Sequence, residues 1–86
     1  MIFVRDVNYL GEYRLSLTFS DGSIRVIDLE SELYGEVFEP LKDLTLFSQV
    51  RFNPDTDTIE WPNGADFSPE FLYRQSTPTG EIKQAA

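Results

Sequence analysis

Carboxylates come nearest to forming a chemical site in this sequence, because its 86 residues include fifteen Asp and Glu but no cysteine and no histidine. Without cysteine there is no disulfide framework, no thiolate nucleophile and no Cys-ligated zinc site. Histidine is the commonest general base and metal ligand, and its pKa normally lies near neutrality. Acid–base chemistry would therefore need a carboxylate or a lysine with a strongly shifted pKa. We predict that the chain is not an enzyme and that it has no catalytic residues, no bound metal and no cofactor.

Two arrangements of carboxylates could nevertheless form a site. Residues 55–60 begin like a calcium-binding loop, but Glu60 stands where that loop needs glycine, and Asp66 stands where it needs glutamate. Turn residues between two strands explain this segment fully. Asp28, Glu60 and Asp66 lie near predicted strand ends and could converge, although only a cleft that shifts one pKa would make them reactive. Their spacing does not require convergence: Asp66 is better explained as support for a helix start, and Glu60 as a solvent-facing side chain.

An acidic run interrupted only by Lys42 is the candidate interaction site. It consists of Asp28, Glu30, Glu32, Glu36, Glu39 and Asp43. The whole chain has a formal net charge of −8, which disfavours direct binding to nucleic acid or to an anionic membrane. The same charge would speed encounter with a basic partner protein. The alternative is a solvated face that only maintains solubility.

The residues that surround these carboxylates predict an antiparallel sheet at the start of the chain. Residues 14–19 alternate between apolar and polar side chains, as a half-buried strand does. Residues 1–10 and 24–29 are also rich in strand-forming residues, which gives a three-stranded meander. The Asp-Gly turn after residue 19 could have two, three or four loop residues. Even lengths pair Leu17 with Val26 and keep the apolar sets on one face, whereas three residues would set Leu17 opposite Arg25; we favour the even lengths.

Short helical pieces and a second hairpin are expected next. Apolar residues recur at three- and four-residue steps over residues 30–47, which predicts one or two short helical turns laid on the sheet, because Pro40 prevents one long helix. Residues 50–53 and 58–61 predict a hairpin with a four-residue loop that pairs Phe52 with Ile59. Ser68 and Pro69 then supply an N-cap and a first helical residue for a short C-terminal helix.

One motif lies between the second hairpin and this helix. Trp61 could be an exposed recognition residue, but its alternation with Ile59 favours the core, and Pro62, Asn63 and Gly64 favour a turn. We therefore expect a structural role for Trp61, Pro62, Asn63, Gly64 and Asp66.

These elements predict a single α+β domain over residues 1–74. Residues 75–86 offer little that could be buried, and we expect a disordered tail there.

The first residues do not resemble a signal peptide, and no apolar stretch is long enough to cross a membrane, so we expect a cytoplasmic protein. A chain of this size buries little more apolar area than folding requires, so a homodimer is plausible.

Several of these segments together resemble a known family. The resemblance rests on Phe19-Ser20-Asp21-Gly22, Asp28-Leu29, the spacing of Phe38, Leu41 and Asp43, Ile59-Glu60-Trp61-Pro62-Asn63-Gly64-Ala65-Asp66, and Pro69-Glu70 with Leu72-Tyr73. The chain is similar to small bacterial proteins grouped as domain of unknown function number 2442, over about residues 1–74. The resemblance implies a small α+β fold, found also as the amino-terminal domain of longer proteins that continue into a helix-turn-helix, and a suggested antitoxin-like role beside another small protein. It implies no catalytic residues.

Three functions remain open from the sequence. The first is a non-enzymatic protein-interaction module that binds a basic partner protein, for which the resemblance suggests an antitoxin-like role. The second is a small-molecule-binding domain with a pocket between the sheet and residues 30–47. The third is an accessory domain of a transcriptional regulator, which has less support because only about a dozen residues follow the last predicted helix.

Overall fold

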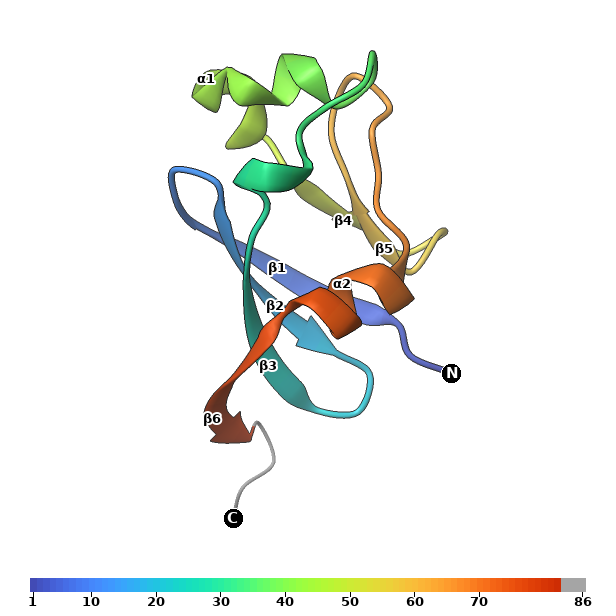
Figure 1. Cartoon of the computed structure of the whole chain (residues 1–86). Helices are drawn as coiled ribbons and strands as arrows, with labels where there is room; N and C mark the ends of the chain where they lie inside the picture. The colour runs from blue at the N-terminus through green and yellow to red at the C-terminus, as the bar shows by residue number, and fades with distance from the viewer. Residues whose placement is uncertain (83–86) are drawn as a thin grey trace.

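A four-stranded antiparallel sheet forms one layer of the molecule, and the helical pieces and a second hairpin lie against one of its faces (Figure 1). This computed structural model describes residues 1–82, with side chains described through Thr79. The sheet order is β1-β2-β3-β6. Its strands are β1 (Val4–Gly11), β2 (Arg14–Phe19), β3 (Ser23–Asp28) and β6 (Thr77–Ile82). The predicted α+β fold class is confirmed.

Strand β2 shows why one face of the sheet becomes the core. Its alternating sequence buries Leu15, Leu17 and Phe19, whereas Ser16 and Thr18 are half-buried on the other face. Side chains alternate between faces along a strand, so a pattern of period two presents one continuous apolar surface. The prediction for this strand is confirmed.

The register of the first hairpin differs from the one we predicted. Thr18 lies opposite Ile24 and Leu17 lies opposite Arg25, so the β2–β3 loop has three residues and the even loop lengths were wrong. Gly22 has a φ of +87° and donates its N–H to the carbonyl of Phe19 at 2.9 Å. A glycine at positive φ at the end of a tight turn is typical of three-residue hairpin loops.

Arg25 is the physical reason that this register is stable. The register turns its side chain toward the core face, where its Nε donates to Ser76 Oγ and its guanidinium donates to the Ser76 carbonyl, both at 2.7 Å. The guanidinium carbon also lies 4.3 Å from the centre of the Tyr73 ring. A buried charge is tolerated when its donors are used, so polar partners from a distant segment replace the apolar pairing that we expected.

The segment after β3 contains the short helical turns that its periodicity predicts. They are η1 (Glu30–Glu32), η2 (Glu39–Lys42) and α1 (Leu44–Phe47). Asp43 caps α1 by accepting the N–H of Thr45 at 3.0 Å. Leu33, Leu41 and Phe47 are fully buried, so this segment covers the core face of the sheet.

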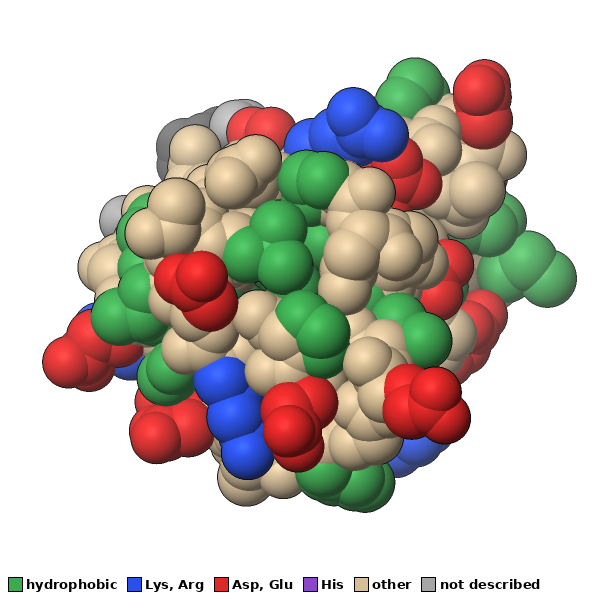
Figure 2. All heavy atoms as spheres, turned by 90° about the horizontal axis from the view of Figure 1, so that it is seen from above, with side chains coloured by type: hydrophobic (Ala, Val, Ile, Leu, Met, Phe, Trp, Pro, Cys, Tyr) green, Lys and Arg blue, Asp and Glu red, His purple; other side chains and the backbone are tan. Residues whose placement is uncertain are grey.

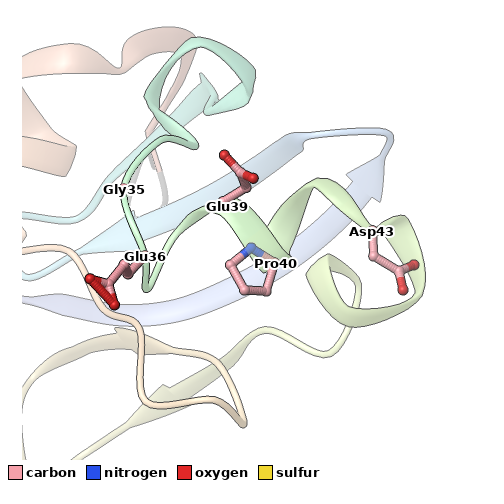
Figure 3. A pocket seen from close by; sticks show the side chains of 5 residues that line it. All are labelled: Gly35, Glu36, Glu39, Pro40 and Asp43. Carbon is pink, nitrogen blue, oxygen red and sulfur yellow. The ribbon is translucent and has the colours of Figure 1, made fainter.

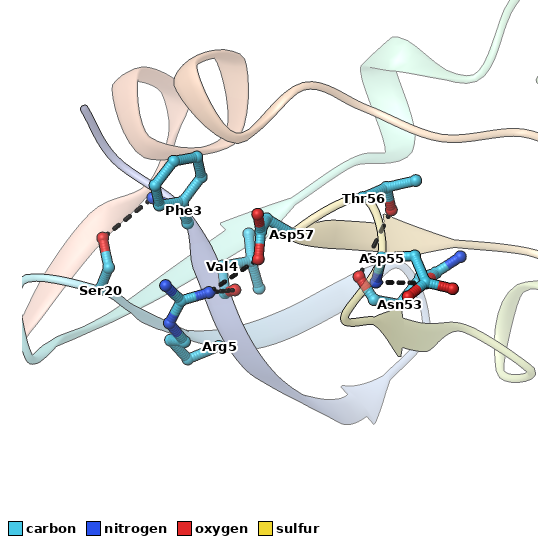
Figure 4. Close-up of polar contacts among 8 residues, drawn as sticks. All are labelled: Phe3, Val4, Arg5, Ser20, Asn53, Asp55, Thr56 and Asp57. Carbon is cyan, nitrogen blue, oxygen red and sulfur yellow. Dashed lines mark hydrogen bonds and ion pairs between the residues drawn. The ribbon is translucent and has the colours of Figure 1, made fainter.

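The second hairpin has the predicted register. Strands β4 (Arg51–Asn53) and β5 (Thr58–Glu60) pair with Phe52 opposite Ile59. The loop between them contacts β1, because Asp57 accepts the backbone N–H of Val4 at 3.0 Å and the guanidinium of Arg5 at 2.9 Å (Figure 4).

The last elements are α2 (Pro69–Gln75) and β6. Ser68 caps α2 as predicted, accepting the N–H of Phe71 at 3.2 Å. Our prediction of a disordered tail over residues 75–86 is wrong for residues 77–82, which form β6 and pair with β3. Residues 83–86 lie outside the described part of the chain. The domain therefore extends beyond residue 74, and the sheet has four strands where three were expected.

Candidate functional site

The six carboxylates of the acidic run follow one another over a single stretch of surface, which we call the acidic segment (residues 28–43). Asp28 ends β3, Glu30 and Glu32 lie on η1, Glu36 lies in a loop, Glu39 begins η2 and Asp43 caps α1. Five are exposed and Glu32 is half-buried. Within residues 1–82 the ion pairs join Arg5 to Asp57 and Arg51 to Glu60, so none of them uses the acidic segment. Six acidic residues and Lys42 give this segment a net charge of −5.

Half of these carboxylates surround one shallow pocket. Gly35, Glu36, Glu39, Pro40 and Asp43 line an open hollow of about 650 Å³. Figure 3 shows the three carboxylates spread around Pro40 and pointing in different directions. All five residues belong to the acidic segment, so the hollow is not between the sheet and residues 30–47, where the sequence placed a ligand pocket. Asp28, Glu30 and Glu32 do not line it.

Exposed apolar side chains flank this pocket in the sequence. Tyr34 is 68% exposed, Val37 49% and Leu44 42%. Seen from the side of α1 and η2, hydrophobic and acidic side chains are interspersed on the same face (Figure 2). We had expected Val37 and Leu44 to face the sheet, and Tyr34 had no place in the predicted pattern. Because Tyr34 stands three residues before Val37 and four before Phe38, its spacing alone gave no signal that it faces solvent.

Two hydrogen bonds from the turn after β5 hold the acidic segment, and α1 that follows it, against the core. The indole N–H of Trp61 donates to the carbonyl of Phe47 at 2.8 Å, in the buried interior. The side-chain amide of Asn63 donates to the carbonyl of Val37 at 2.9 Å. Phe67 stacks on Phe38 with ring centres 4.7 Å apart. The turn thus fixes the middle of the acidic segment and the helix α1 directly after it.

The motif that contains these donors is itself a closed turn. Gly64, at a φ of +90°, donates its N–H to the carbonyl of Trp61, and Asn63 Oδ1 accepts the N–H of Ala65. Trp61 is only 1% exposed, whereas Pro62 and Asp66 are exposed. The arrangement makes Trp61 a core residue and uses Asn63 to reach the neighbouring loop.

Of the three carboxylates near strand ends, those of Glu60 and Asp28 have separate local hydrogen-bond partners. Glu60 accepts from the side-chain amide of Asn53 at 2.8 Å and from Arg51 at 2.9 Å. These hydrogen bonds, with the Arg51 charge, lower the pKa of Glu60 below its ordinary value. Asp28 accepts the backbone N–H of Glu30, and Asp66 is exposed, with its backbone bridged to Glu60. Among the side chains of residues 1–79, no three carboxylates gather into a metal-binding group.

The segment that begins like a calcium loop is a hairpin turn. Asn53 Oδ1 accepts the N–H of Asp55 at 2.8 Å, and the carboxylate of Asp57 is paired with Arg5 (Figure 4). These contacts are those of a turn between paired strands.

No helix in the described part of the chain is long and apolar enough to cross a membrane.

The fold is that of a small α+β domain whose most distinctive surface is an acidic, partly apolar segment held on a sheet. The chain belongs to the family of proteins of unknown function DUF2442, whose match covers residues 4–78. The match includes the turn after β5, α2 and the start of β6. No curated protein and no solved structure gives a significant match.

Proposed function

We propose that this domain is a non-enzymatic protein-interaction module that binds a basic partner protein through the acidic segment, in the manner of an antitoxin-like subunit. The observation that carries the proposal is the charge of this segment, −5 over sixteen residues, with no ion pair to it among the described side chains. Unpaired carboxylates on a surface attract an oppositely charged partner and accelerate its encounter.

The apolar side chains of the segment support the same function. Protein interfaces combine a desolvated apolar centre with a polar rim, and Tyr34, Val37 and Leu44 offer apolar area next to the carboxylates in the sequence. Tyrosine is among the residues enriched at interaction hot spots. The two hydrogen bonds from Trp61 and Asn63 keep the segment ordered before binding, which lowers the entropic cost of association.

Capture of partners from native extract tests the proposal. The chain is immobilised and exposed to extract at low and at high salt, and we expect a stoichiometric basic protein that is retained at low salt and weakened at high salt. A variant with Glu36→Gln and Glu39→Gln should lose most of this binding. The matched control, Asp55→Asn with Glu70→Gln, removes two charges elsewhere and should bind normally. Absence of any stoichiometric partner, or equal binding by both double variants, would contradict the proposal.

A second candidate function is the binding of a small cationic molecule in the pocket. It is favoured by the hollow of about 650 Å³ lined by Glu36, Glu39 and Asp43. A thermal-shift screen separates it from the first function, because a ligand that binds only the folded state raises the melting temperature with its concentration. The expected ligand carries one or more amines or guanidines.

A further inference from the structure

The face of the sheet that points away from the core, which we call the outer sheet face, has no helix or second hairpin over it in Figure 1. The helical pieces, β4 and β5 all lie on the opposite face, where Leu15 and Leu17 are buried. The centre of the outer sheet face is formed by Asn8, Ser16, Thr18, Ile24, Val26 and Thr77, which the strand registers place in two adjacent rows. Four of these side chains are only half-buried, and two of those are apolar.

Charge distinguishes this face from the rest of the molecule. Its charged side chains within the described residues are Asp6, Asp28 and Arg14, two negative and one positive, which gives −1. The whole chain has a net charge of −8, so most of the negative charge is on other surfaces. Two copies would repel each other on those surfaces, and a basic protein would gain little here. The charge distribution therefore favours a second copy of this chain as the occupant of the outer sheet face.

The register makes the face complementary to itself. Arg14 and Asp28 lie directly opposite each other on neighbouring strands, as do Ser16 and Val26. A two-fold axis that runs parallel to the strands, between β2 and β3, places β2 of one copy over β3 of the other. Within its own sheet, each β2 residue pairs with one residue of β3. Across the interface, it then lies opposite that same residue in the second copy. Arg14 meets Asp28 of the second copy, and the same pair forms again on the other side of the axis.

We propose that the chain forms a two-fold symmetric homodimer in which the outer sheet faces of two copies stack, with two reciprocal Arg14–Asp28 ion pairs side by side next to the Val26 side chains. Stacked sheets pack about 10 Å apart with their strands turned by about 30°, which keeps opposed rows within reach of long side chains. The proposal does not depend on the binding of a basic partner, because the dimer face shares only Asp28 with the acidic segment and none of its residues line the pocket.

The size of the face sets the strength expected of this dimer. Four strands about 4.8 Å apart, each about six residues long at about 3.3 Å per residue, give a projected area of about 380 Å². Standard protein interfaces bury about 800 Å² of accessible surface on each partner. The dimer should therefore be reversible, with a dissociation constant of micromolar order.

Sedimentation velocity of the full chain from about 1 µM to about 500 µM tests the proposal across this range of affinity. The dimer fraction should rise with concentration. Val26→Lys should weaken dimerisation about tenfold or more. Thr77→Glu should have an effect of the same size, and because Thr77 is exposed, this second variant does not place a charge at a half-buried position. Arg74→Glu, on α2 at the opposite side of the sheet, changes the net charge by as much as the Arg14→Asp variant described next, and it should dimerise like the wild type.

A charge exchange tests the arrangement of the two copies. Arg14→Asp and Asp28→Arg should each weaken the dimer, and the double variant should regain most of the affinity because both reciprocal pairs form again in reverse. Circular dichroism of each variant checks its fold, since Asp28 also accepts the N–H of Glu30. Three results would each overturn the proposal. The first is a protein that stays monomeric at every concentration, and the second is a folded Val26→Lys or Thr77→Glu variant that dimerises like the wild type. The third is a folded double variant whose dimer is no tighter than that of the weaker single variant.

Discussion

The indole of Trp61 lies between two parts of the chain that are distant in sequence. Its N–H is donated to the carbonyl of Phe47, and its ring contacts both Phe47 and Phe67, with ring centres 5.4 Å and 5.9 Å away. This buried carbonyl also accepts the backbone N–H of Val50 at 3.2 Å, so the indole supplies one of its two hydrogen bonds.

Trp61→Phe should therefore destabilise the fold while preserving its shape. The phenyl ring keeps most of the apolar contact but removes one of the two donors to the carbonyl of Phe47, which costs about 0.5–1.5 kcal/mol. Urea denaturation followed by circular dichroism measures the change. Tyr9→Phe, which removes an exposed hydroxyl bonded to the carbonyl of Glu12, is the control and should change stability little. Equal stability of wild type and Trp61→Phe would show that the indole bond contributes nothing.

Glu60 gives the domain a predictable dependence on pH. Hydrogen bonds from Asn53 and from Arg51 lower the pKa of Glu60 in the folded state. A lowered folded-state pKa means that the unfolded chain binds the proton more readily, so acid favours unfolding. The stabilisation is present above the ordinary glutamate pKa of about 4.3 and is lost as the pH falls through the lower folded-state value.

Glu60→Gln should consequently flatten the acid limb of the stability curve. Melting temperatures of the wild type and of Glu60→Gln, measured from about pH 7 to about pH 3, should converge as the pH falls through the region of the glutamate pKa. Glu70→Gln is the matched control and should leave the acid limb as steep as in the wild type. Two parallel curves for wild type and Glu60→Gln would be inconsistent with a lowered pKa for Glu60.

At the scale of elements, β6 is joined to the sheet by a polar contact as well as by strand pairing. Arg25 donates twice to Ser76, the residue that precedes β6, and Ser76 Oγ in turn donates to the carbonyl of Tyr73. Tyr73 completes the contact by donating its hydroxyl to Asp21 at 2.8 Å. One side chain of β3 thus fixes both the end of α2 and the start of β6.

Arg25→Met should release β6 before it affects the rest of the sheet. The substitution keeps an unbranched apolar stem but removes every donor to Ser76, at a cost of about 1–3 kcal/mol. Hydrogen exchange should accelerate more at the amides of β6 than at those of the β1–β2 pair. Arg74→Met, at an exposed position in the last turn of α2, is the control. Unchanged protection in β6 would show that strand pairing alone retains it.

Most elements of the fold could be predicted because local signals agreed with the tertiary structure. The alternation of residues 14–19, the four-residue loop at 54–57 and the capping pair Ser68-Pro69 each fix one conformation locally. The register of the second hairpin followed from pairing apolar residues on one face. The same reasoning failed at the first hairpin, because the partners of Arg25 lie 51 residues away and have no local signal.

Strand β6 was missed for a related reason. Its sequence, Thr-Pro-Thr-Gly-Glu-Ile, has no apolar alternation and includes two residues that are unfavourable in strands. The strand exists because β3 offers it a pairing edge and Arg25 fixes the residue before it. Such a strand depends on tertiary contacts, which a single sequence does not reveal.

The acidic segment, in contrast, could be predicted from the sequence, because charge is a property of composition. The pocket in this segment could not, because it depends on how the loop at Gly35 and η2 are placed.

At the scale of the whole molecule, the net charge of −8 opposes folding through self-repulsion. The acidic segment concentrates much of this repulsion, because its carboxylates have no ion pair among the described side chains. Salt screens such exposed charges, with a Debye length of about 8 Å at physiological ionic strength.

Sodium chloride should therefore raise the melting temperature between about 0.02 M and about 0.5 M. The variant with Glu36→Gln and Glu39→Gln should begin from a higher melting temperature and show a smaller rise, because less repulsion remains to be screened. Differential scanning calorimetry of both proteins measures the difference. A melting temperature that falls with salt would mean that attractive ion pairs outweigh the repulsion.

Trp61 is the one tryptophan of the chain, and it is buried with its N–H bonded to the end of α1, the helix that follows the acidic segment. The intrinsic fluorescence of the protein therefore comes largely from this single ring, in an apolar environment that should give a blue-shifted emission maximum. Any event that separates the segment from the core would move this maximum to longer wavelength without added dye or label. Partner titrations can thus be followed optically, and they would distinguish a segment that stays docked from one that is lifted away.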